Sequence, residues 1–302
     1  MSLARSPVQV AVGVVLRDDG AVLLGQRPVG KPYAGWWEFP GGKLEQGESV
    51  GEALIRELHE ELGLQVASSC PWVVREFVYP HAHVRLHFHR VFEFSGEPHG
   101  REGQAFAWRK PDEIDVAPLL PATVPVLSWL QLAQCSLQCT RWDGDDDSLL
   151  SAMQRALETP GYWADRRPMV LLDLPQMPAS RFEALYYRIR ALCRELGGQL
   201  LVGSRHPASF AAAAEGMLID THLLCELEQR PAGRLVGARC ATSADLSRAA
   251  ELGLDFALLA EPARLVDAPI PALLEVSAAT RVETACQQGA HGVAVELAFW
   301  QD

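Results

Sequence analysis

The sequence lacks the features of several protein classes. Its seven cysteines are odd in number, scattered and never spaced as CxxC, which argues against a disulfide framework or a structural zinc site. No apolar run is long enough to cross a membrane, and the first ten residues do not resemble a signal peptide. Basic residues are few, since 27 Lys and Arg stand against 38 Asp and Glu, for a formal charge of -11. We therefore expect a reduced, cytoplasmic protein that binds neither a membrane nor a nucleic-acid polymer.

The length and composition indicate two α/β domains. With 302 residues, 48% of them hydrophobic and 22% charged, the chain can form two cores at roughly 100 to 200 residues per domain. We expect the domains at residues 1–132 and 133–302, with the boundary inside residues 131–147. That segment ends in an acidic run, which favours a solvated turn over a metal site: Asp143, Asp145, Asp146 and Asp147.

In the first domain, turn residues and apolar periodicity predict strands around one strong helix. Asp18, Asp19 and Gly20 supply the turn between two strands in residues 8–24. The other expected elements are a loop over 28–42, a helix over 49–62, strands over 72–79 and 83–94, and a short helix near 126–132.

The second domain alternates short apolar runs with helical stretches. Strands are expected over 169–174, 199–203, 217–219, 234–237, 256–259, 272–276 and 292–295, and helices over 180–196, 207–215, 243–252 and 281–288. This alternation predicts parallel α/β units that form a small TIM-barrel-like domain.

The helix over residues 49–62 carries a concentration of carboxylates. Ser49 and Glu52 predict a capping box at its start, and Gly63 suits the left-handed residue that ends it. Leu54, Ile55, Leu58 and Leu62 form the expected apolar side. A second strip carries the three carboxylates of Glu57, Glu60 and Glu61. Because like charges on one strip destabilise a helix, a divalent cation that prefers oxygen ligands, Mg²⁺, is the expected compensation.

The spacing around this helix exceeds what a solvated acidic face requires. Gly42 is followed by five residues, Glu48, seven residues and the run REXXEEXGX, which here is REL-HEE-LGL from Arg56 to Leu64. Seven fixed residue types coincide by chance in about one of 10⁸ windows. The pattern is that of the Nudix family, which the sequence resembles. The flanking WEFPGGK of residues 37–43 is similar to MutT-type members, and the resemblance covers about residues 8–130.

The resemblance implies an α/β/α sandwich with a mixed sheet. It also implies hydrolysis of a damaged or non-canonical nucleoside triphosphate, such as 8-oxo-dGTP, to monophosphate and pyrophosphate. Binding of Mg²⁺, which Mn²⁺ can replace, is assigned to Gly41, Glu57, Glu60, Glu61 and Glu102. Catalysis is assigned to the same four glutamates and to Arg56. Substrate binding is assigned to Arg27, Glu38, Phe39 and Thr123.

Two positions depart from the MutT pattern for oxidised guanine. Thr123 stands where an asparagine reads the base, and Ala82 stands where an arginine lies on the phosphate side. A hydroxyl lacks the paired donor and acceptor of an amide, so base readout is expected to differ while pyrophosphohydrolysis is retained.

A second pattern consists of basic residues at every other position of the strand expected over 83–94. Period two places His81, His83, Arg85, His87 and His89 on one face. This favours a polar sheet face beside a phosphate pocket over a zinc site.

Residues 133–302 resemble the thiamine phosphate synthase barrel that occurs behind MutT-like domains in some bacteria. The resemblance implies lost chemistry, because Asp173 replaces a substrate-binding arginine, and Gly203 and Ser204 replace an Asn–Asp pair that includes a magnesium ligand. Val276 and Ser277 replace a glycine pair. The connection over residues 261–271 is also too short for a full crossover helix. We expect a degenerate barrel without synthase activity.

Three functions remain open from the sequence. The first is hydrolysis of a nucleoside triphosphate or another small diphosphate. The second, suggested by the fusion, is hydrolysis of a thiamine-related diphosphate, and the third is non-catalytic metabolite sensing. Retention of the three helical glutamates argues against the third. The sequence does not indicate the number of metal ions or the oligomeric state.

Overall fold

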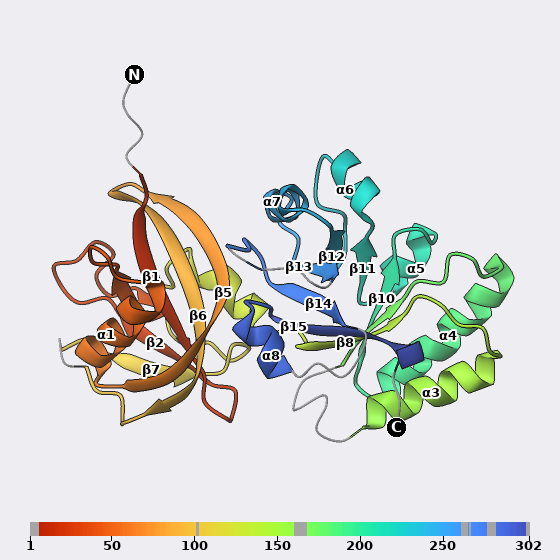
Figure 1. Cartoon of the computed structure of the whole chain (residues 1–302), viewed down its shortest axis with the longest axis horizontal. Helices are drawn as coiled ribbons and strands as arrows, with labels where there is room; N and C mark the ends of the chain where they lie inside the picture. Colours follow the sequence, from red (N-terminus) through yellow and green to blue (C-terminus); the bar gives the residue numbers. More distant parts are fainter. Residues whose placement is uncertain are drawn as a thin grey trace. The chain divides into compact units, whose positions relative to one another are not determined.

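The computed structural model describes residues 6–100, 103–159, 168–260, 265, 267–276 and 282–299. The chain divides into two compact units, Met1–Leu132 and Ala133–Asp302, each with its own sheet structure (Figure 1). No helix in these ranges has both the length and the apolar character needed to cross a bilayer.

The first unit contains a four-stranded mixed sheet and a three-stranded antiparallel sheet. The mixed sheet has the order β4-β1-β6-β5, with β1 parallel to β6 and the other pairs antiparallel. The second sheet has the order β3-β2-β7. The elements are β1 Val8–Val15, β2 Val22–Gln26, β3 Trp37–Glu38, β4 Gly41–Lys43, α1 Val50–Leu62, β5 Gln65–Tyr79, β6 Ala82–Ser95, β7 Phe106–Arg109 and α2 Thr123–Trp129.

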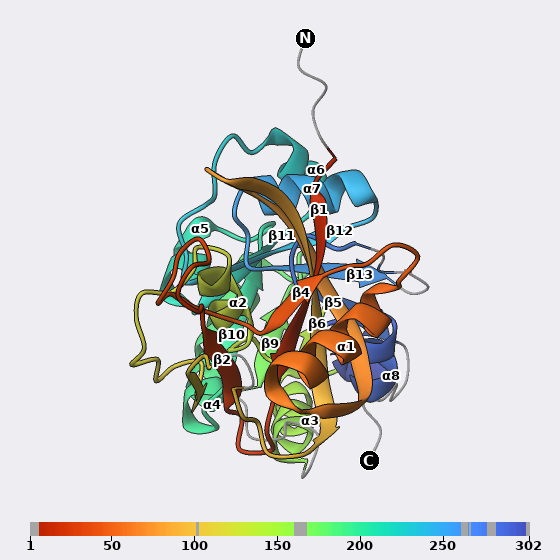
Figure 2. The same cartoon turned by 90° about the vertical axis from the view of Figure 1, so that its left-hand side faces the viewer.

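Helix α1 begins and ends where the sequence predicts. Ser49 is the N-cap and forms a complete capping box with Glu52, while Gly63 ends the helix with φ of 73°. The helix packs across β1, β4 and β5 (Figure 2). Leu54 and Leu58 are fully buried against β1, where an added Cβ on Gly13 would lie only 3.1 Å from each of them. The helix therefore sits close to the sheet and is held at a fixed rotation.

One residue of the predicted apolar side of α1 is misplaced. Ile55 is 44% exposed, whereas Leu54, Leu58 and Leu62 are buried. The prediction for Ile55 is wrong because it lies at the edge of the apolar stripe, beyond the contact with the sheet.

The second unit is a closed barrel of eight parallel strands in the order β10-β11-β12-β13-β14-β15-β8-β9. The strands are β8 Cys135–Cys139, β9 Met169–Leu172, β10 Gln199–Gly203, β11 Gly216–Ile219, β12 Leu235–Cys240, β13 Phe256–Ala260, β14 Ala272–Val276 and β15 Gly292–Glu296. The helices are α3 Asp146–Glu158, α4 Ala179–Glu195, α5 Ala208–Ala213, α6 Thr221–Glu226, α7 Ser243–Glu251, α8 Val282–Gln287 and the 3-10 turn Leu297–Phe299. The predicted fold class, two α/β domains with a TIM-barrel-like second domain, is confirmed.

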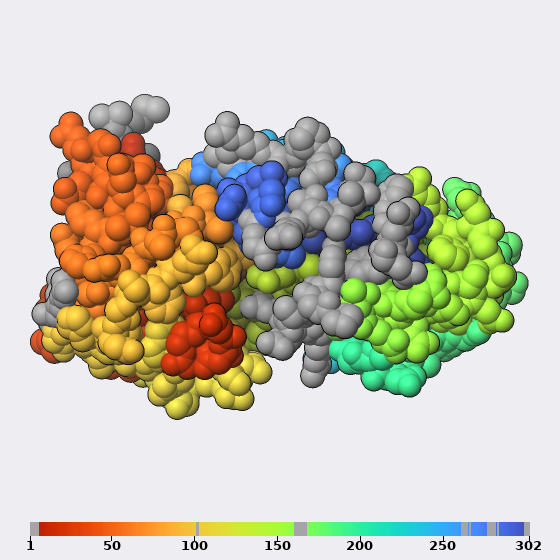
Figure 3. Space-filling model, turned by 60° about the horizontal axis from the view of Figure 1, so that its bottom comes forward, coloured from red at the N-terminus to blue at the C-terminus, as the bar shows by residue number. Residues whose placement is uncertain are grey.

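Helices α3 and α4 lie side by side on the outside of this barrel, where their side chains form a continuous surface (Figure 3). Their buried faces share one core with β8, β9 and β10, formed by residues such as Leu149, Phe182, Leu137 and Leu172. The outward side chains of these strands are therefore apolar. Residues at the alternate positions point into the barrel.

The barrel differs from the prediction at its beginning. The predicted solvated turn near Asp143 instead leads into α3, because Asp145 caps that helix and accepts a hydrogen bond from the amide of Ser148. Strand β8 and helix α6 were not predicted either. The sequence predicts that the connection between β13 and β14 is too short for a full helix. Its described residues, 265 and 267–271, form no helix. Ser277 and Arg281 lie outside the described residues.

Candidate active site

A cavity of about 640 Å³ lies in the first unit and gathers residues from most of its elements. Among the residues that line it are seven predicted site residues: Arg27, Glu38, Phe39, Gly41, Glu57, Glu61 and Thr123. Ala82, the position of the missing arginine, lines it as well. The other three predicted residues differ in placement. Arg56 and Glu60 are not among the lining residues, and Glu102 lies outside the described residues.

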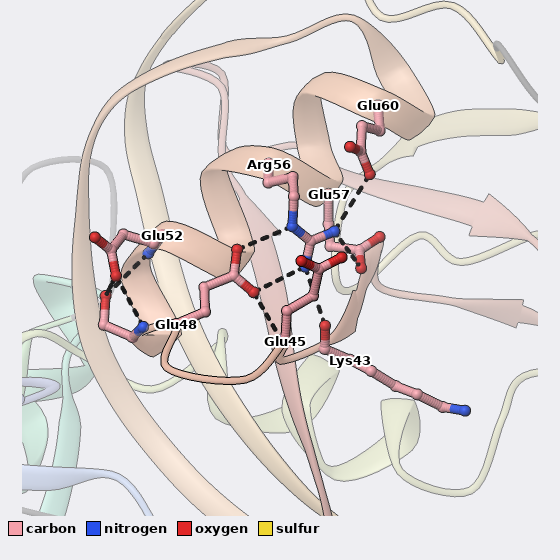
Figure 4. Close-up of polar contacts among 8 residues, drawn as sticks. Lys43, Glu45, Glu48, Glu52, Arg56, Glu57 and Glu60 are labelled. Atoms are coloured by element: carbon pink, nitrogen blue, oxygen red, sulfur yellow. Dashed lines mark hydrogen bonds and ion pairs between the residues drawn. The ribbon is translucent and has the colours of Figure 1, made fainter.

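The guanidinium group of Arg56 contacts the carboxylates of Glu48, Glu57 and Glu60 (Figure 4). Its Nε and Nη2 atoms each donate to one oxygen of Glu48 at 2.9 Å, and Nη1 donates to Glu57 at 2.9 Å and to Glu60 at 3.2 Å. Nη2 also donates to the carbonyl oxygen of Lys43 at 3.1 Å. These bonds tie α1 to β4 and to the loop between them, so the guanidinium fixes the rotamer of Glu57.

The same hydrogen bonds shift the pKa values of Glu48 and Arg56 toward their charged forms. Hydrogen bonds from the Arg56 guanidinium and from the Glu45 amide lower the pKa of the Glu48 carboxyl. The bonds to Glu48 and Glu57 raise the pKa of Arg56 further above its ordinary value. Glu48 therefore pairs with Arg56 and holds it where its Nη1 atom can donate to the Glu57 carboxylate at the cavity wall.

Gly42 makes room for the Glu57 carboxylate. A Cβ atom at Gly42 would lie 2.1 Å from both Cδ and Oε1 of Glu57, well inside van der Waals contact. The glycine at position 42 is thus explained by the lack of space for a side chain, since β4 and α1 lie on either side of this carboxylate. Neither periodicity nor propensity indicates this close approach in the sequence.

The donors at this end of the cavity suit a hard divalent cation. Glu57 and Glu61 line the cavity beside Gly41, and carboxylate and carbonyl oxygens are the ligands that Mg²⁺ prefers. Glu60 has a side chain that is 58% exposed and shares Arg56 with Glu57. Within the described ranges, no group of three or more His, Cys, Asp or Glu side chains is assembled closely enough to hold a metal ion. The side chains at the cavity therefore fit the ion chemically, without forming a closed cage.

The opposite side of the cavity carries the residues predicted to bind substrate. Arg27 forms an ion pair with Glu38 and donates from Nε to the carbonyl oxygen of Pro32 at 2.7 Å. Burial raises the pKa of Glu38, although Arg27 and Lys31 oppose the shift. Phe39 and Thr123 are each 3% exposed. This wall thus combines a cation, a desolvated acid and apolar surface.

An aromatic cluster at the cavity was not predicted from the sequence. The ring of Tyr33 lies 5.6 Å from that of Tyr79 and 5.6 Å from that of His81, and Tyr79 stacks on His81 at 5.7 Å. All three residues line the cavity, and burial raises the pKa of Tyr79. Tyr33 has a left-handed backbone with φ of 60° in a loop rich in Gly and Pro. In the sequence, the one sign of this cluster is an aromatic residue, Tyr33, within a loop rich in Gly and Pro.

The basic face of β6 points away from the cavity, so the prediction that it borders a phosphate pocket is wrong. The even-numbered residues Val84, Leu86 and Phe88 line the cavity. The odd-numbered residues of β6 lie on the opposite face, where Val91 packs in the core under α1. This opposite face carries His83, Arg85, His87 and His89. His87 instead bonds Gln9 at 2.7 Å, and burial lowers the pKa of His89 to about 4. Only His81, in the hairpin turn, lines the cavity.

Comparison with known proteins identifies this unit. The family profile of the NUDIX domain matches residues 7–130. Over 122 residues the chain is 40% identical to the CTP pyrophosphohydrolase of Escherichia coli strain K12, a match covering 38% of this chain and 86% of that protein. The chain belongs to the Nudix family. It is therefore a hydrolase that acts on diphosphate bonds, and the Nudix prediction is confirmed.

Two further Nudix relatives carry the name 8-oxo-dGTP diphosphatase. The protein of Haemophilus influenzae is 37% identical over 120 residues, which are 40% of this chain and 88% of the relative. The Escherichia coli strain K12 protein is 33% identical over 124 residues, which are 41% of this chain and 96% of the relative. These three matches each cover between 38% and 41% of this chain, and the NUDIX profile ends at residue 130, before the barrel begins.

We expect Arg56→Lys to lower kcat by about 10 to 100-fold with a smaller effect on KM. A lysine keeps the positive charge but cannot bridge Glu48, Glu57 and the Lys43 carbonyl oxygen at the same time. Steady-state kinetics measure the effect. Arg109→Lys, at an exposed pair with Asp115 outside the cavity lining, is the control and should retain activity within about twofold. Wild-type kcat in Arg56→Lys would contradict the positioning role.

Proposed function

We propose that the Nudix domain hydrolyses a damaged or non-canonical nucleoside triphosphate, to the monophosphate and pyrophosphate, in the presence of Mg²⁺. The observation that carries the proposal is the composition of one cavity. Its acidic end holds Glu57, Glu61 and Gly41, and its other end holds Arg27 together with an aromatic and apolar wall. Acidic groups that suit a cation and an apolar, aromatic wall that suits a base thus line one cavity, a combination that fits a nucleotide.

The names of the relatives support this substrate class, since they describe a CTP pyrophosphohydrolase and 8-oxo-dGTP diphosphatases. Base readout is expected to differ from that of the oxidised-guanine enzymes. Thr123 is buried and lines the cavity, and its hydroxyl donates and accepts at a single oxygen, whereas an amide presents its donor and its acceptor on two separate atoms. We infer a base preference broader than oxidised guanine alone.

In the proposed reaction, Glu57, Glu61 and the Gly41 carbonyl oxygen would hold Mg²⁺, with Glu60 and Glu102 as further predicted ligands. When bound, the ion would neutralise phosphate charge and activate the attacking water. Arg56 holds the Glu57 carboxylate in place, and Arg27 offers a cation to the phosphates. Phe39, which lines the cavity and is 3% exposed, would offer apolar surface to the base. No nucleophilic side chain is required.

The proposal is tested by a hydrolysis screen in Mg²⁺ over 8-oxo-dGTP, CTP, the ordinary deoxynucleoside triphosphates, nucleoside diphosphate sugars and thiamine diphosphate. We expect the highest kcat/KM for a nucleoside triphosphate, with pyrophosphate as the product and no activity after chelation by EDTA. Release of inorganic phosphate as the first product would contradict the proposed bond. A preference for diphosphate sugars or thiamine diphosphate would contradict the substrate class.

A further inference from the structure

The inside of the barrel in the second unit changes character along its length. Its outward residues pack with α3 and α4, which places the alternate residues inside. Toward the amino ends of the strands the inward residues include Ser136 and the ring of Phe256, which lies so close to Gly237 that an added Cβ would be 2.2 Å from it. Near the carboxyl ends, the inward residues are charged or polar.

Gln138 and Asp173 form the deepest polar layer. Gln138 lies on β8 in register with Leu171 of β9 and Glu296 of β15, and the amide of Asp173 extends the β8–β9 pairing by donating to Cys139 at 3.0 Å. The two residues are only 3% and 1% exposed. Because they alternate with outward Leu137, Cys139 and Leu172, both point into the barrel.

Each of these two buried side chains has one atom without a hydrogen-bond partner among the described residues. The atoms are Nε2 of Gln138 and Oδ1 of Asp173. His206 Nε2 lies 3.4 Å from that oxygen, but it accepts a hydrogen bond from the Leu174 amide and so has no proton to donate when neutral. Buried polar atoms are seldom left unpaired, and an unpaired carboxylate oxygen is costly. A donor is therefore missing at this point.

Charged pairs surround this layer on the side of the strand ends. Arg205, after β10, donates to Asp173 at 2.7 Å and lies 3.0 Å from Asp220, after β11. Arg239 of β12 pairs with Glu275 of β14. These guanidinium groups remain 44% and 29% exposed, whereas Asp173 is buried, so solvent reaches the ring of charges and the unpaired oxygen lies beneath it.

Glu296 of β15 completes this polar end, where it accepts hydrogen bonds from the amide and hydroxyl of Thr140 at 3.0 and 2.7 Å. With Arg141 near Glu296, four carboxylates in the described part of the barrel end face three guanidinium groups. The excess is negative, and the guanidinium groups of Arg205 and Arg239 are already paired with acids. An anionic ligand would have to break these pairs and approach the buried Asp173.

We propose that the carboxyl end of this barrel is a second ligand site, which binds a small organic cation carrying an amine or amidine group. The cation donates to Oδ1 of Asp173, and an acceptor atom on the same ligand receives a hydrogen bond from Nε2 of Gln138. The location agrees with the end at which barrels of this architecture place their ligands. The same buried acid disfavours a phosphorylated ligand at this point.

The test is titration calorimetry of the full-length chain with benzamidine, and with benzoate and inorganic pyrophosphate as anionic counterparts. Benzamidine and benzoate share shape and differ in charge. We expect benzamidine to bind at one site and the two anions not to bind to the barrel. Binding of benzoate or pyrophosphate to the wild-type chain with an affinity that changes in Asp173→Asn, or no binding of benzamidine at all, would overturn the proposal.

Variants locate the site. Asp173→Asn should weaken benzamidine binding by about 10 to 100-fold, the loss expected for a charge-assisted hydrogen bond. Asp146→Asn is the matched control, because Asp146 of α3 pairs with Arg181 of α4 on the outside of the barrel, and this variant should bind as wild type. If thermal denaturation shows that Asp173→Asn does not fold, Asp220→Asn provides the same test. We expect Asp220→Asn to weaken benzamidine binding by about threefold or more. Unchanged affinity in a folded Asp173→Asn or Asp220→Asn variant would contradict the assignment.

Discussion

Replacing Glu57 by glutamine is expected to reduce kcat by about 10³-fold or more. The substitution keeps the shape of the side chain and removes the charge at the cavity wall beside Gly41 and Glu61. An amide binds a divalent cation far more weakly than a carboxylate, and the loss of a direct ligand exceeds the ~10 to 100-fold typical of residues that only orient ligands. Steady-state pyrophosphate release in Mg²⁺ measures the effect.

Glu61→Gln is expected to behave in the same way, because Glu61 also lines the cavity. Glu113→Gln is the matched control, since Glu113 is exposed in the same unit and outside the cavity lining. It should keep wild-type kinetics. Wild-type turnover in either cavity variant would show that the wrong carboxylates have been assigned to the metal.

Gly42→Ala is expected to reduce kcat by about 100-fold with little loss of stability. The new methyl group would lie 2.1 Å from the Glu57 carboxylate, which is the mobile end of a side chain and must move away. Gly42 lacks a left-handed backbone, so alanine causes no backbone strain there. The displaced carboxylate would lose both its place at the cavity and its bond from Arg56. Kinetics and thermal unfolding of the same preparation separate the two effects.

Gly51→Ala is the control for Gly42→Ala. Gly51 lies in the first turn of α1 with no atom within 4 Å of an added Cβ. Alanine there should leave kcat unchanged and stabilise the fold by about 0.5 to 1 kcal/mol, because it favours helix. A loss of stability in Gly42→Ala that accounts for its loss of activity would contradict the steric explanation. So would full activity in that variant.

The elements with strong local signals could be predicted from the sequence. Helix α1 has a capping box at Ser49, a terminating Gly63 and an apolar stripe, and the structure places its ends within one residue of the prediction. In the barrel, β10 and β14 have the predicted bounds, because each is a short apolar run between turn residues. In these elements the local sequence preferences agree with the tertiary structure.

Other elements depend on tertiary context and were missed. Strand β8, with the sequence CSLQC, has polar Ser136 and Gln138 on its inward face, so it does not resemble a buried strand of a parallel sheet. The acidic run before α3 resembles a turn, although Asp145 is a helix cap and Asp147 pairs with Arg188 of α4. The barrel partners that make these residues favourable are distant in sequence.

The candidate site shows the same division. That Glu57 and Glu61 lie at one cavity could be predicted because their spacing matches the Nudix pattern, whereas the aromatic cluster of Tyr33, Tyr79 and His81 arises from loops that meet only in the fold. The orientation of β6 could not be predicted from period two alone, since alternation defines two faces without saying which one covers the cavity.

The central claim, that the acidic end of the cavity holds the divalent cation used in hydrolysis, is tested most directly by anomalous scattering. A crystal of the full-length chain soaked in Mn²⁺ with a non-hydrolysable nucleoside triphosphate analogue should show a manganese peak within coordination distance of Glu57, Glu61 and the Gly41 carbonyl oxygen. The phosphates should lie between that peak and Arg27. A fully occupied analogue with no manganese peak beside those oxygens would contradict the account.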